Sequence, residues 1–355
     1  MPTDLNAPLP VRKGEELPIE PLEAYLLEHL PGSSGPLTVE QFSHGHSNLT
    51  YLLKLGDREM VLRRPPFGNQ VKTAHDMGRE YRVLSQLHSI YAPAPRPFLY
   101  CEDPSILGDA CYVMERRHGV ILRKRLPSGL AIDEPTAKRL SESAIDNLVA
   151  LHTLDYQSAG LSGLGKPEGF VQRQVEGWSK RYVQAMTEPI PGMDRIATWL
   201  SENIPSDSRA SVIHNDYKYD NLLLDPDDLT RVEAVLDWEM ATLGDPLMDL
   251  GTTLGYWVEA NDPQELQVAA FGPTTFPGTL TRSQLIERYQ DQSGQTVNNP
   301  VFYYCFGVFK IAVIVQQIYA RYVRGHTQDP RFANLNRIVA IMSQQANTAI
   351  ERGDL

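Results

Sequence analysis

The stretch that decides the fold is His214-Asn215-Asp216-Tyr217-Lys218-Tyr219-Asp220-Asn221, followed after a short hairpin by Asp237-Trp238-Glu239. It sets one carboxylate, Asp216, five residues before an amide, Asn221, and adds a second carboxylate, Asp237. A carboxylate can accept the proton of an attacking hydroxyl, and an amide with a second carboxylate suits Mg²⁺, which prefers oxygen ligands. The first run alone is also typical of a polar turn between strands. Together with Asp237, it favours phosphoryl transfer from a nucleotide.

Composition narrows the classes of partner. The 355 residues, 42% of them hydrophobic, allow one large or two ordinary domains with a buried core. A net charge of -11 argues against nucleic acid and anionic membranes as partners, so a small-molecule substrate is expected. Three widely spaced cysteines without a CxxC pattern are typical of a reducing cytoplasm, the location that we expect. The N-terminus lacks the basic and apolar regions of a signal peptide.

The first 114 residues predict a small lobe. Residues 1–20 are rich in proline and charge and predict a flexible lead. An antiparallel sheet of about five strands and one helix, 74–87, is expected next, with the strands at 39–42, 49–55, 60–64, 98–101 and 110–114. Glu80 lies on the apolar stripe of that helix, where an unpaired carboxylate would cost several kcal/mol. Arg63, at the end of a strand, is the expected partner.

Residues 120–355 predict a large, mostly helical lobe, which a hinge at 115–119 would join to the sheet. Amphipathic patterns indicate helices at 136–154, 171–186 and 193–203, and three more after residue 246. Short strands, 221–224 and 232–236, interrupt them around the opening motif. The apolar stretch 301–322 contains Lys310 and two glutamines, and we interpret it as a buried core helix, not a membrane span.

The order of strand meander, hinge, HxDxxxxN and D-x-E resembles the aminoglycoside phosphotransferase family of protein-kinase-like folds. Residues 214–255, which include Val235-Leu236-Asp237-Trp238-Glu239, Leu243-Gly244-Asp245-Pro246 and Asp249-Leu250, are similar to the kinase-like domains fused to acyl-CoA dehydrogenases. The resemblance implies a two-lobed α+β fold that binds ATP and Mg²⁺ between a small sheet-containing lobe and a large helical lobe.

The resemblance also implies roles within the catalytic loop, 214–221, and the metal-binding segment, 237–239. Asp216 would be the catalytic base, and Asn221 and Asp237 would be metal ligands. Lys218 matches a lysine that protein kinases carry two residues after the catalytic aspartate, where it offsets charge on the transferring phosphate.

Two further residues would support the loop. The resemblance implies that His214 braces it and that Asp249 accepts hydrogen bonds from its backbone. A helix cap is an equally good interpretation of Asp249.

For the nucleotide, the resemblance places Arg63 where kinases carry the lysine that grips the α- and β-phosphates, with Glu80 as its helix partner. Arginine is longer and planar, so phosphate distances could differ; a purely structural ion pair is the alternative. The turn 43–48 has one glycine and occupies the position of the phosphate-covering loop, where Ser47 and Asn48 could hold phosphate oxygens.

The expected adenine site is the hinge. It would offer backbone groups of Glu115 and Arg116, with Met114 lining the base pocket, although core packing explains Met114 equally well. The basic residues in 116–125 are either a solvated face or a recognition site for an anionic substrate such as a coenzyme A thioester.

The predicted activity is transfer of the γ-phosphoryl group of ATP to a hydroxyl of a small molecule, with a hydroxyacyl compound favoured. Three alternatives stay open: a kinase for aminoglycosides or other cationic acceptors, a catalytically silent nucleotide-binding pseudokinase, and a metal-dependent hydrolase. The pattern leaves undecided the choice of ATP or GTP, the number of metal ions, the role of Glu239 and the oligomeric state.

Overall fold

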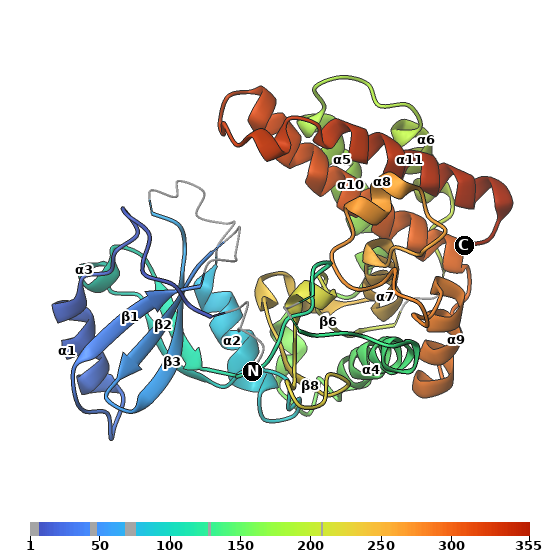
Figure 1. The fold of residues 1–355 in the computed structure, drawn as a ribbon. Coiled ribbons are helices and arrows are strands. Elements are labelled where there is room, and N and C mark those ends of the chain that lie inside the picture. The colour runs from blue at the N-terminus through green and yellow to red at the C-terminus, as the bar shows by residue number, and fades with distance from the viewer. Residues whose placement is uncertain (1–6, 43–47, 68–75, 127–128, 207–208) are drawn as a thin grey trace.

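The computed structural model describes residues 7–42, 48–67, 76–126, 129–206 and 209–355. They form a two-lobed α+β fold, in which a small sheet-containing lobe faces a larger helical lobe (Figure 1). The small lobe is built on one antiparallel sheet in the order β1-β2-β3-β5-β4, with strands Leu37–Gln41, Leu49–Leu55, Arg58–Arg64, Pro97–Cys101 (β4) and Cys111–Glu115 (β5). The five expected strands are confirmed, with ends that shift by a few residues.

The sheet is buried on both faces. One face packs against α1 (Ile19–His29) and the short helix α3 (Pro104–Leu107), through side chains such as Leu26 and Leu53. The other carries Val61 and Met114, which join the main core of the molecule. Because side chains alternate along a strand, the two sets come from neighbouring positions.

The lead before α1 is docked on the sheet. The backbone groups of Leu9 and Gln41 exchange two hydrogen bonds of 2.8 Å, and the Tyr51 hydroxyl donates to the carbonyl of Glu15 at 2.8 Å. Residues 9–15 of the expected flexible lead therefore lie against the sheet, because an edge strand offers unpaired backbone groups that this segment satisfies.

Helix α2 (Met77–Leu87) carries the expected inward carboxylate. It begins after Asp76, whose side chain accepts the N–H of Arg79, and residues 74–75 of the expected helix lie outside the described residues. Glu80 is fully buried on the same side of the helix as Met77 and Leu84. The apolar stripe therefore brings a charge into the interface between the lobes.

The chain crosses between the lobes in extended conformation. β5 ends at Glu115, and Val120 then pairs with Leu224 of the helical lobe through two backbone hydrogen bonds of 2.8 and 2.9 Å. A side chain on Gly119 would collide with the carbonyl oxygen of Leu224. The crossing is thus held against the hairpin that follows the catalytic loop.

The large lobe is mostly helical. In it, α4 (Glu134–His152) precedes α5 (Phe170–Ala185) and α6 (Met193–Glu202). The described chain after residue 245 contains five helices instead of the three expected: α7 (Pro246–Tyr256), α8 (Gln264–Val268), α9 (Arg282–Ser293), α10 (Pro300–Val323) and α11 (Leu335–Arg352). Short 3-10 turns lie at Leu161–Gly163, Tyr219–Asn221, Trp238–Met240 and Pro330–Phe332.

Two small two-stranded sheets carry the opening motif. β6 (Ser211–Ile213) pairs with β9 (Thr242–Gly244), and β7 (Leu222–Leu224) pairs with β8 (Val232–Val235). The catalytic loop joins β6 to β7, and Asp237 follows β8. Two strand ends therefore deliver the candidate residues to one place.

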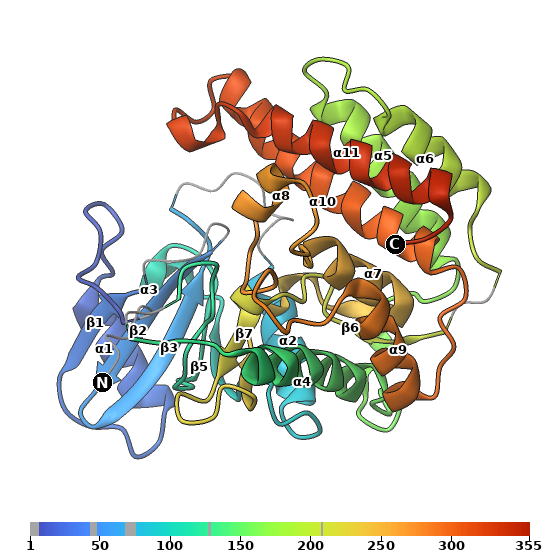
Figure 2. The same cartoon turned by 45° about the vertical axis from the view of Figure 1, so that its right-hand side comes forward.

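Helix α10 is the central helix of the large lobe. It lies against α7 and α11, as both views show (Figures 1 and 2). By length and composition it could cross a membrane, but 78% of its most apolar 18-residue stretch is buried inside the structure. This burial agrees with the interpretation of residues 301–322 as a core helix.

Helices α7 and α10 touch backbone to backbone. A Cβ on Gly251 would overlap the carbonyl of Tyr303, and one on Gly307 would overlap the carbonyl of Gly251. Only glycine at both positions permits this approach.

We expect Gly307→Ala to lower the free energy of unfolding by about 1–3 kcal/mol, because the added methyl group must push the two helices apart. Gly163→Ala is the control, since an added Cβ there meets no atom within 4 Å. Denaturant unfolding of both variants checks this, and equal stabilities would contradict the close contact.

Candidate active site

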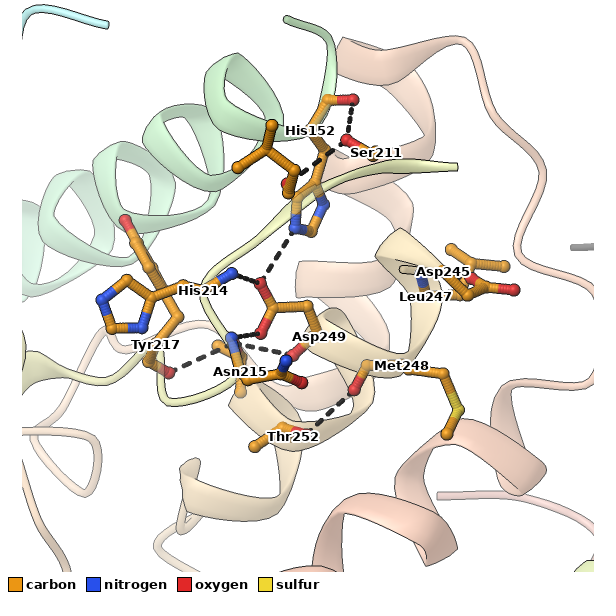
Figure 3. A network of polar contacts seen from close by, with 12 residues as sticks. His152, Ser211, His214, Asn215, Tyr217, Asp245, Leu247, Met248, Asp249 and Thr252 are labelled. Carbon is orange, nitrogen blue, oxygen red and sulfur yellow. Dashed lines mark hydrogen bonds and ion pairs between the residues drawn. The ribbon is translucent and has the colours of Figure 1, made fainter. Parts of the chain in front are cut away.

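The catalytic loop is held by the carboxylate of Asp249 in α7. The backbone N–H of His214 donates to its Oδ2 at 2.7 Å, and that of Asn215 donates to its Oδ1 at 2.8 Å (Figure 3). The cap of α7 is instead Asp245, which accepts the N–H of Leu247 at 2.8 Å. The hydrogen-bonding arrangement implied by the resemblance is therefore present, and the helix-cap interpretation of Asp249 is wrong.

Asp249 is itself fixed from the other side. His152, at the end of α4, has its Nε2 3.2 Å from Asp249 Oδ2, and its Nδ1 lies 2.9 Å from the hydroxyl of Tyr289 (Figure 3 shows the Asp249 contact). Burial alone would raise the pKa of Asp249, but these donors and the loop N–H groups hold it below its ordinary value. The carboxylate stays charged while fully buried.

The ring of His214 braces the loop in one tautomer. Its Nδ1 lies 3.2 Å from the backbone N–H of Asp216, and its Nε2 lies 2.9 Å from the carbonyl oxygen of Leu236. An N–H can only donate and a carbonyl can only accept, so the proton belongs on Nε2 and the ring is neutral. His214 thereby ties the loop to the strand end that leads to Asp237.

Asp216 lies at the centre of a set of donors. Its Oδ1 accepts the hydroxyl of Tyr256 at 2.7 Å, and its Oδ2 accepts Lys218 Nζ at 2.8 Å and Asn221 Nδ2 at 3.0 Å. These three hydrogen bonds fix the direction in which the carboxylate points. A group of this kind can accept a proton from a hydroxyl placed beside it.

Lys218 rests against two aromatic rings. Its Nζ is 4.7 Å from the ring centre of Tyr256 and 5.5 Å from that of Phe271, which pack edge to face. Burial raises the pKa of Tyr256 well above its ordinary value, and the nearby Asp216 adds to this, so the phenol remains a neutral donor. The lysine is therefore directed at Asp216 by a cation–π contact and an ion pair together.

Arg63 links the two lobes. Its Nη1 donates to Glu80 Oε1 at 2.5 Å, and its Nη2 donates to Asp237 Oδ1 at 2.9 Å. Glu80 Oε1 also accepts the backbone N–H of Trp238 at 3.1 Å. Burial alone would lower the pKa of Arg63, but the carboxylates of Glu80 and Asp237 raise it well above its usual value. The expected pair is confirmed, and it extends to the metal-binding segment.

Asn221 and Asp237 fit a divalent cation by their chemistry. Asn221 uses its Nδ2 to reach both the carbonyl and the carboxylate of Asp216, so neither bond involves its Oδ1. Arg63 contacts only one of the two oxygens of Asp237 among the contacts described. One amide oxygen and one carboxylate, completed by phosphate oxygens and water, is a ligand set that Mg²⁺ accepts. Clusters of three or more His, Cys, Asp or Glu side chains suited to a metal are absent from the described residues.

Asn215 and Asp237 have positive φ angles, which are uncommon for residues other than glycine. Among the described non-glycine residues, positive φ angles occur at Asn215 (67°), Asp237 (68°) and Asn299 (54°). Two of these three flank or supply the predicted chemistry. Such conformations cost about 1–3 kcal/mol and cluster at functional sites.

Glu239 connects the metal-binding segment to the small lobe. Its Oε2 accepts Asn48 Nδ2 at 2.9 Å. Burial and the neighbouring Asp237 raise the pKa of Glu239 to about 7. Asn48, predicted to hold phosphate oxygens, is thus bound to a carboxylate, whereas Ser47 and the rest of 43–47 lie outside the described residues.

The comparisons with known proteins identify one family. The sequence model of the phosphotransferase enzyme family matches residues 38–281, more than half of the chain. The chain belongs to this family. The assignment covers the sheet, the catalytic loop and Asp237.

Curated relatives are larger proteins. Acyl-CoA dehydrogenase family member 10 of Mus musculus is 34% identical over 341 residues, which cover 95% of this chain and 31% of the relative. Acyl-CoA dehydrogenase family member 11 of Homo sapiens is 35% identical over 343 residues, which cover 94% and 43%. The chain therefore spans less than half the length of these relatives, and matches their kinase-like part.

Solved structures agree. A Ralstonia eutropha protein assigned as an aminoglycoside phosphotransferase is 33% identical, with a TM-score of 0.79 over 95% of this chain and 99% of that one. A choline kinase from Cryptosporidium parvum has a TM-score of 0.61 at 14% identity over 93% and 96%, which shows the fold alone. The predicted protein-kinase-like fold is confirmed.

The structure accounts for one of the backbone groups that the hinge was predicted to offer. The N–H of Glu115 donates to the carbonyl of Arg96 at 2.8 Å, so it is not offered to a ligand. Arg116 Nη1 contacts Glu59 at 2.7 Å on β3. Met114 is buried in the main core, as the packing alternative expected. A backbone N–H of the hinge that binds adenine would therefore lie beyond Glu115, and the role predicted for the backbone of Arg116 stays a prediction.

Several basic residues of 116–125 have partners within the fold. Arg117 pairs with Glu115 at 2.7 Å, Arg123 lies 3.5 Å from Asp220, and Lys124 donates to the carbonyl of Val268 at 2.7 Å. These partners make the cluster structural and weaken its interpretation as an anion site.

Sequence reasoning missed Tyr256 and Lys310. Tyr256 lies seven residues after Asp249, and this spacing puts both on one face of α7. Lys310 Nζ donates to the carbonyl of Asn215 at 2.5 Å. A lone cation in an apolar helix must find a partner, and that rule could have indicated it.

We expect Asp249→Asn to lower the free energy of unfolding by about 1–3 kcal/mol or more, because an amide can accept only on one side and leaves a buried N–H unsatisfied. Asp133→Asn is the control, since asparagine replaces aspartate well at an exposed helix cap. Urea unfolding of both variants measures the difference; similar losses would argue against the anchoring role.

Proposed function

We propose that this protein transfers the γ-phosphoryl group of ATP to a hydroxyl of a small molecule. The observation that supports this best is the setting of Asp216, which is oriented by three donors and tied through His214 to the segment that carries Asp237. Asp216 would accept the proton of the acceptor hydroxyl as the oxygen attacks phosphorus. General-base assistance of this kind is worth roughly 10² to 10⁴ in rate.

The donor nucleotide would be handled by residues that already form one network. Asn221 and Asp237 would hold Mg²⁺, which when bound supplies charge neutralisation at the phosphates. Arg63 lies beside Asp237 and would contact phosphate oxygens, with Glu80 holding its other end. Lys218, at 2.8 Å from Asp216, would offset charge that develops on the transferred group.

A hydroxyacyl compound is the acceptor class that the surroundings of Asp216 favour. Phe271 and Val268 are 38% and 65% exposed, and Phe271 packs on the same Tyr256 that donates to Asp216. This apolar edge suits a hydrocarbon chain, and the ammonium of Lys218 would repel a polycation. The names of the curated relatives, acyl-CoA dehydrogenases, point to the same class.

A silent nucleotide-binding scaffold has one observation in its favour. Arg63 is held by two carboxylates at 2.5 and 2.9 Å, an arrangement that phosphates must share or break. Binding without turnover would support this second candidate.

Asp216→Ala should reduce ATP-dependent phosphorylation of a hydroxyacyl acceptor by about 10² or more, with ATP affinity nearly unchanged. Asp237→Ala should instead abolish the Mg²⁺-dependent part of ATP binding, because a metal ligand is lost. Coupled ADP release and calorimetry, repeated with GTP, measure the two effects.

Undiminished turnover in Asp216→Ala would refute the base, and normal Mg²⁺-ATP binding in Asp237→Ala would remove it from the metal site. Wild-type protein that binds ATP but phosphorylates no hydroxyacyl compound, aminoglycoside or choline-like amine would favour the scaffold. Product formed without ATP would favour a hydrolase.

Phe271→Ala should raise the KM for a hydroxyacyl acceptor by about tenfold or more, because burying an aromatic side chain is worth about 1.5–3 kcal/mol, while the KM for ATP stays constant. Val183→Ala, exposed on α5, is the control. Steady-state kinetics decide this, and a changed KM for an aminoglycoside alone would favour a cationic acceptor.

A further inference from the structure

Lys310 is a buried cation in the core helix of the large lobe. It is 2% exposed, and its Nζ donates to the carbonyl oxygen of Asn215 at 2.5 Å. Asn215 directly precedes the candidate base, Asp216. A lysine of α10, 95 positions later in the sequence, therefore contacts the backbone of the catalytic loop.

The charged groups around Lys310 come from three elements. Asp216 and Lys218 lie in the loop, Asp249 lies in α7, and Arg181 lies in α5. The ring of Trp178 in α5 is 5.8 Å from Nζ. Two carboxylates and two cations thus leave no single ion pair that would explain the lysine as a stabilising contact.

Burial of this ammonium carries a cost. Burial lowers the pKa of Lys310 to about 8, which means that the folded protein holds the charge less well than water does. The neighbours of Lys310 in α10, Phe309 and Ile311, are apolar and buried. An apolar side chain of similar length would pack there without this penalty, so the retained lysine requires another explanation.

The hydrogen bonds of Asn215 supply one. Its N–H donates to Asp249 at 2.8 Å, its Nδ2 donates to the carbonyl of Met240 at 3.0 Å, and its own carbonyl accepts Lys310. The residue has a φ of 67°, in the left-handed region that asparagine adopts more readily than most residues, and these hydrogen bonds hold it there. Lys310 completes the set by fixing the peptide group that joins Asn215 to Asp216.

We propose that Lys310 is a positioning residue for the phosphotransfer reaction: its ammonium holds the Asn215 carbonyl and so fixes the direction in which the Asp216 carboxylate points. The effect on turnover rests on the proposed function, whereas the effect on the loop does not. A displacement of about 1 Å in a reacting group can cost roughly 10² in rate, so this contact is sufficient to matter.

The first experiment measures the loop without any substrate. Hydrogen exchange of the peptide covering 214–221 should be at least tenfold faster in Lys310→Met than in the wild type. Gln316→Met is the matched control, since Gln316 is also a buried polar residue of α10 but donates to the carbonyl of Ala185, far from the loop in sequence. Equal loop exchange in Lys310→Met and the wild type would overturn the proposal.

The second experiment separates positioning from stabilisation. Between pH 8 and 10.5, which are the folded and ordinary pKa values of Lys310, this side chain binds its proton more tightly in the unfolded chain than in the folded one. The contribution of Lys310 to stability, measured as the difference between the wild type and Lys310→Met, should therefore rise with pH. Lys310→Met should be at least as stable as the wild type at pH 7. A clearly less stable variant would make Lys310 an ordinary structural residue.

The third experiment measures kcat at saturating concentrations of ATP and acceptor. Lys310→Met should lower kcat by tenfold to a hundredfold with little change in either KM, and Lys310→Arg should keep activity above pH 8, where wild-type kcat falls, because arginine stays charged. Unchanged kcat in Lys310→Met, or the same alkaline loss in Lys310→Arg, would refute the proposal. Wild-type inactivity would refute only the proposed function, because the exchange result stands alone.

Discussion

The acceptance of two backbone N–H groups by the Asp249 carboxylate is the interaction on which the rest of the site depends. It fixes the start of the catalytic loop at 2.7 and 2.8 Å, and His152 holds the carboxylate in turn. A buried charge with three donors is both oriented and costly to disturb. The loop is therefore attached to α7 as well as to its own strands, and this attachment fixes the backbone next to Asp216.

The two lobes communicate through a second carboxylate. Glu80 receives Arg63 from the sheet and the N–H of Trp238 from the segment after β8. A ligand that draws Arg63 toward phosphate must alter the same network that positions Asp237. The pair identified from sequence as a possible structural ion pair is thus the place where nucleotide binding and the geometry of the metal-binding segment would be coupled.

Sequence reasoning succeeded where short-range patterns carry the information. Strand 49–55 follows from β-forming residues bounded by turn signals, and the pairing of Arg63 with Glu80 follows from the cost of an unpaired carboxylate on an apolar stripe. It failed where tertiary packing decides. The contact of Asn48 with Glu239 joins residues 191 positions apart, and no periodicity reports it. Lys310 was recognised only as an interruption of an apolar run, because its partner is a backbone carbonyl that carries no sequence signature.

The glycine contact between α7 and α10 fixes the distance between these two helices. Gly251 follows Asp249 by two residues, and Gly307 precedes Lys310 by three, so the backbone contact lies within one turn of both side chains that grip the loop. The spacing between the helices is set by backbone atoms, which cannot adjust by changing rotamer. Substitutions that change side-chain size elsewhere in the lobe therefore leave the helix spacing beside the catalytic loop unchanged. Substitutions in the other helices of this lobe can therefore change their packing without changing the distance between Asp249 and Lys310, the two side chains that hold the loop.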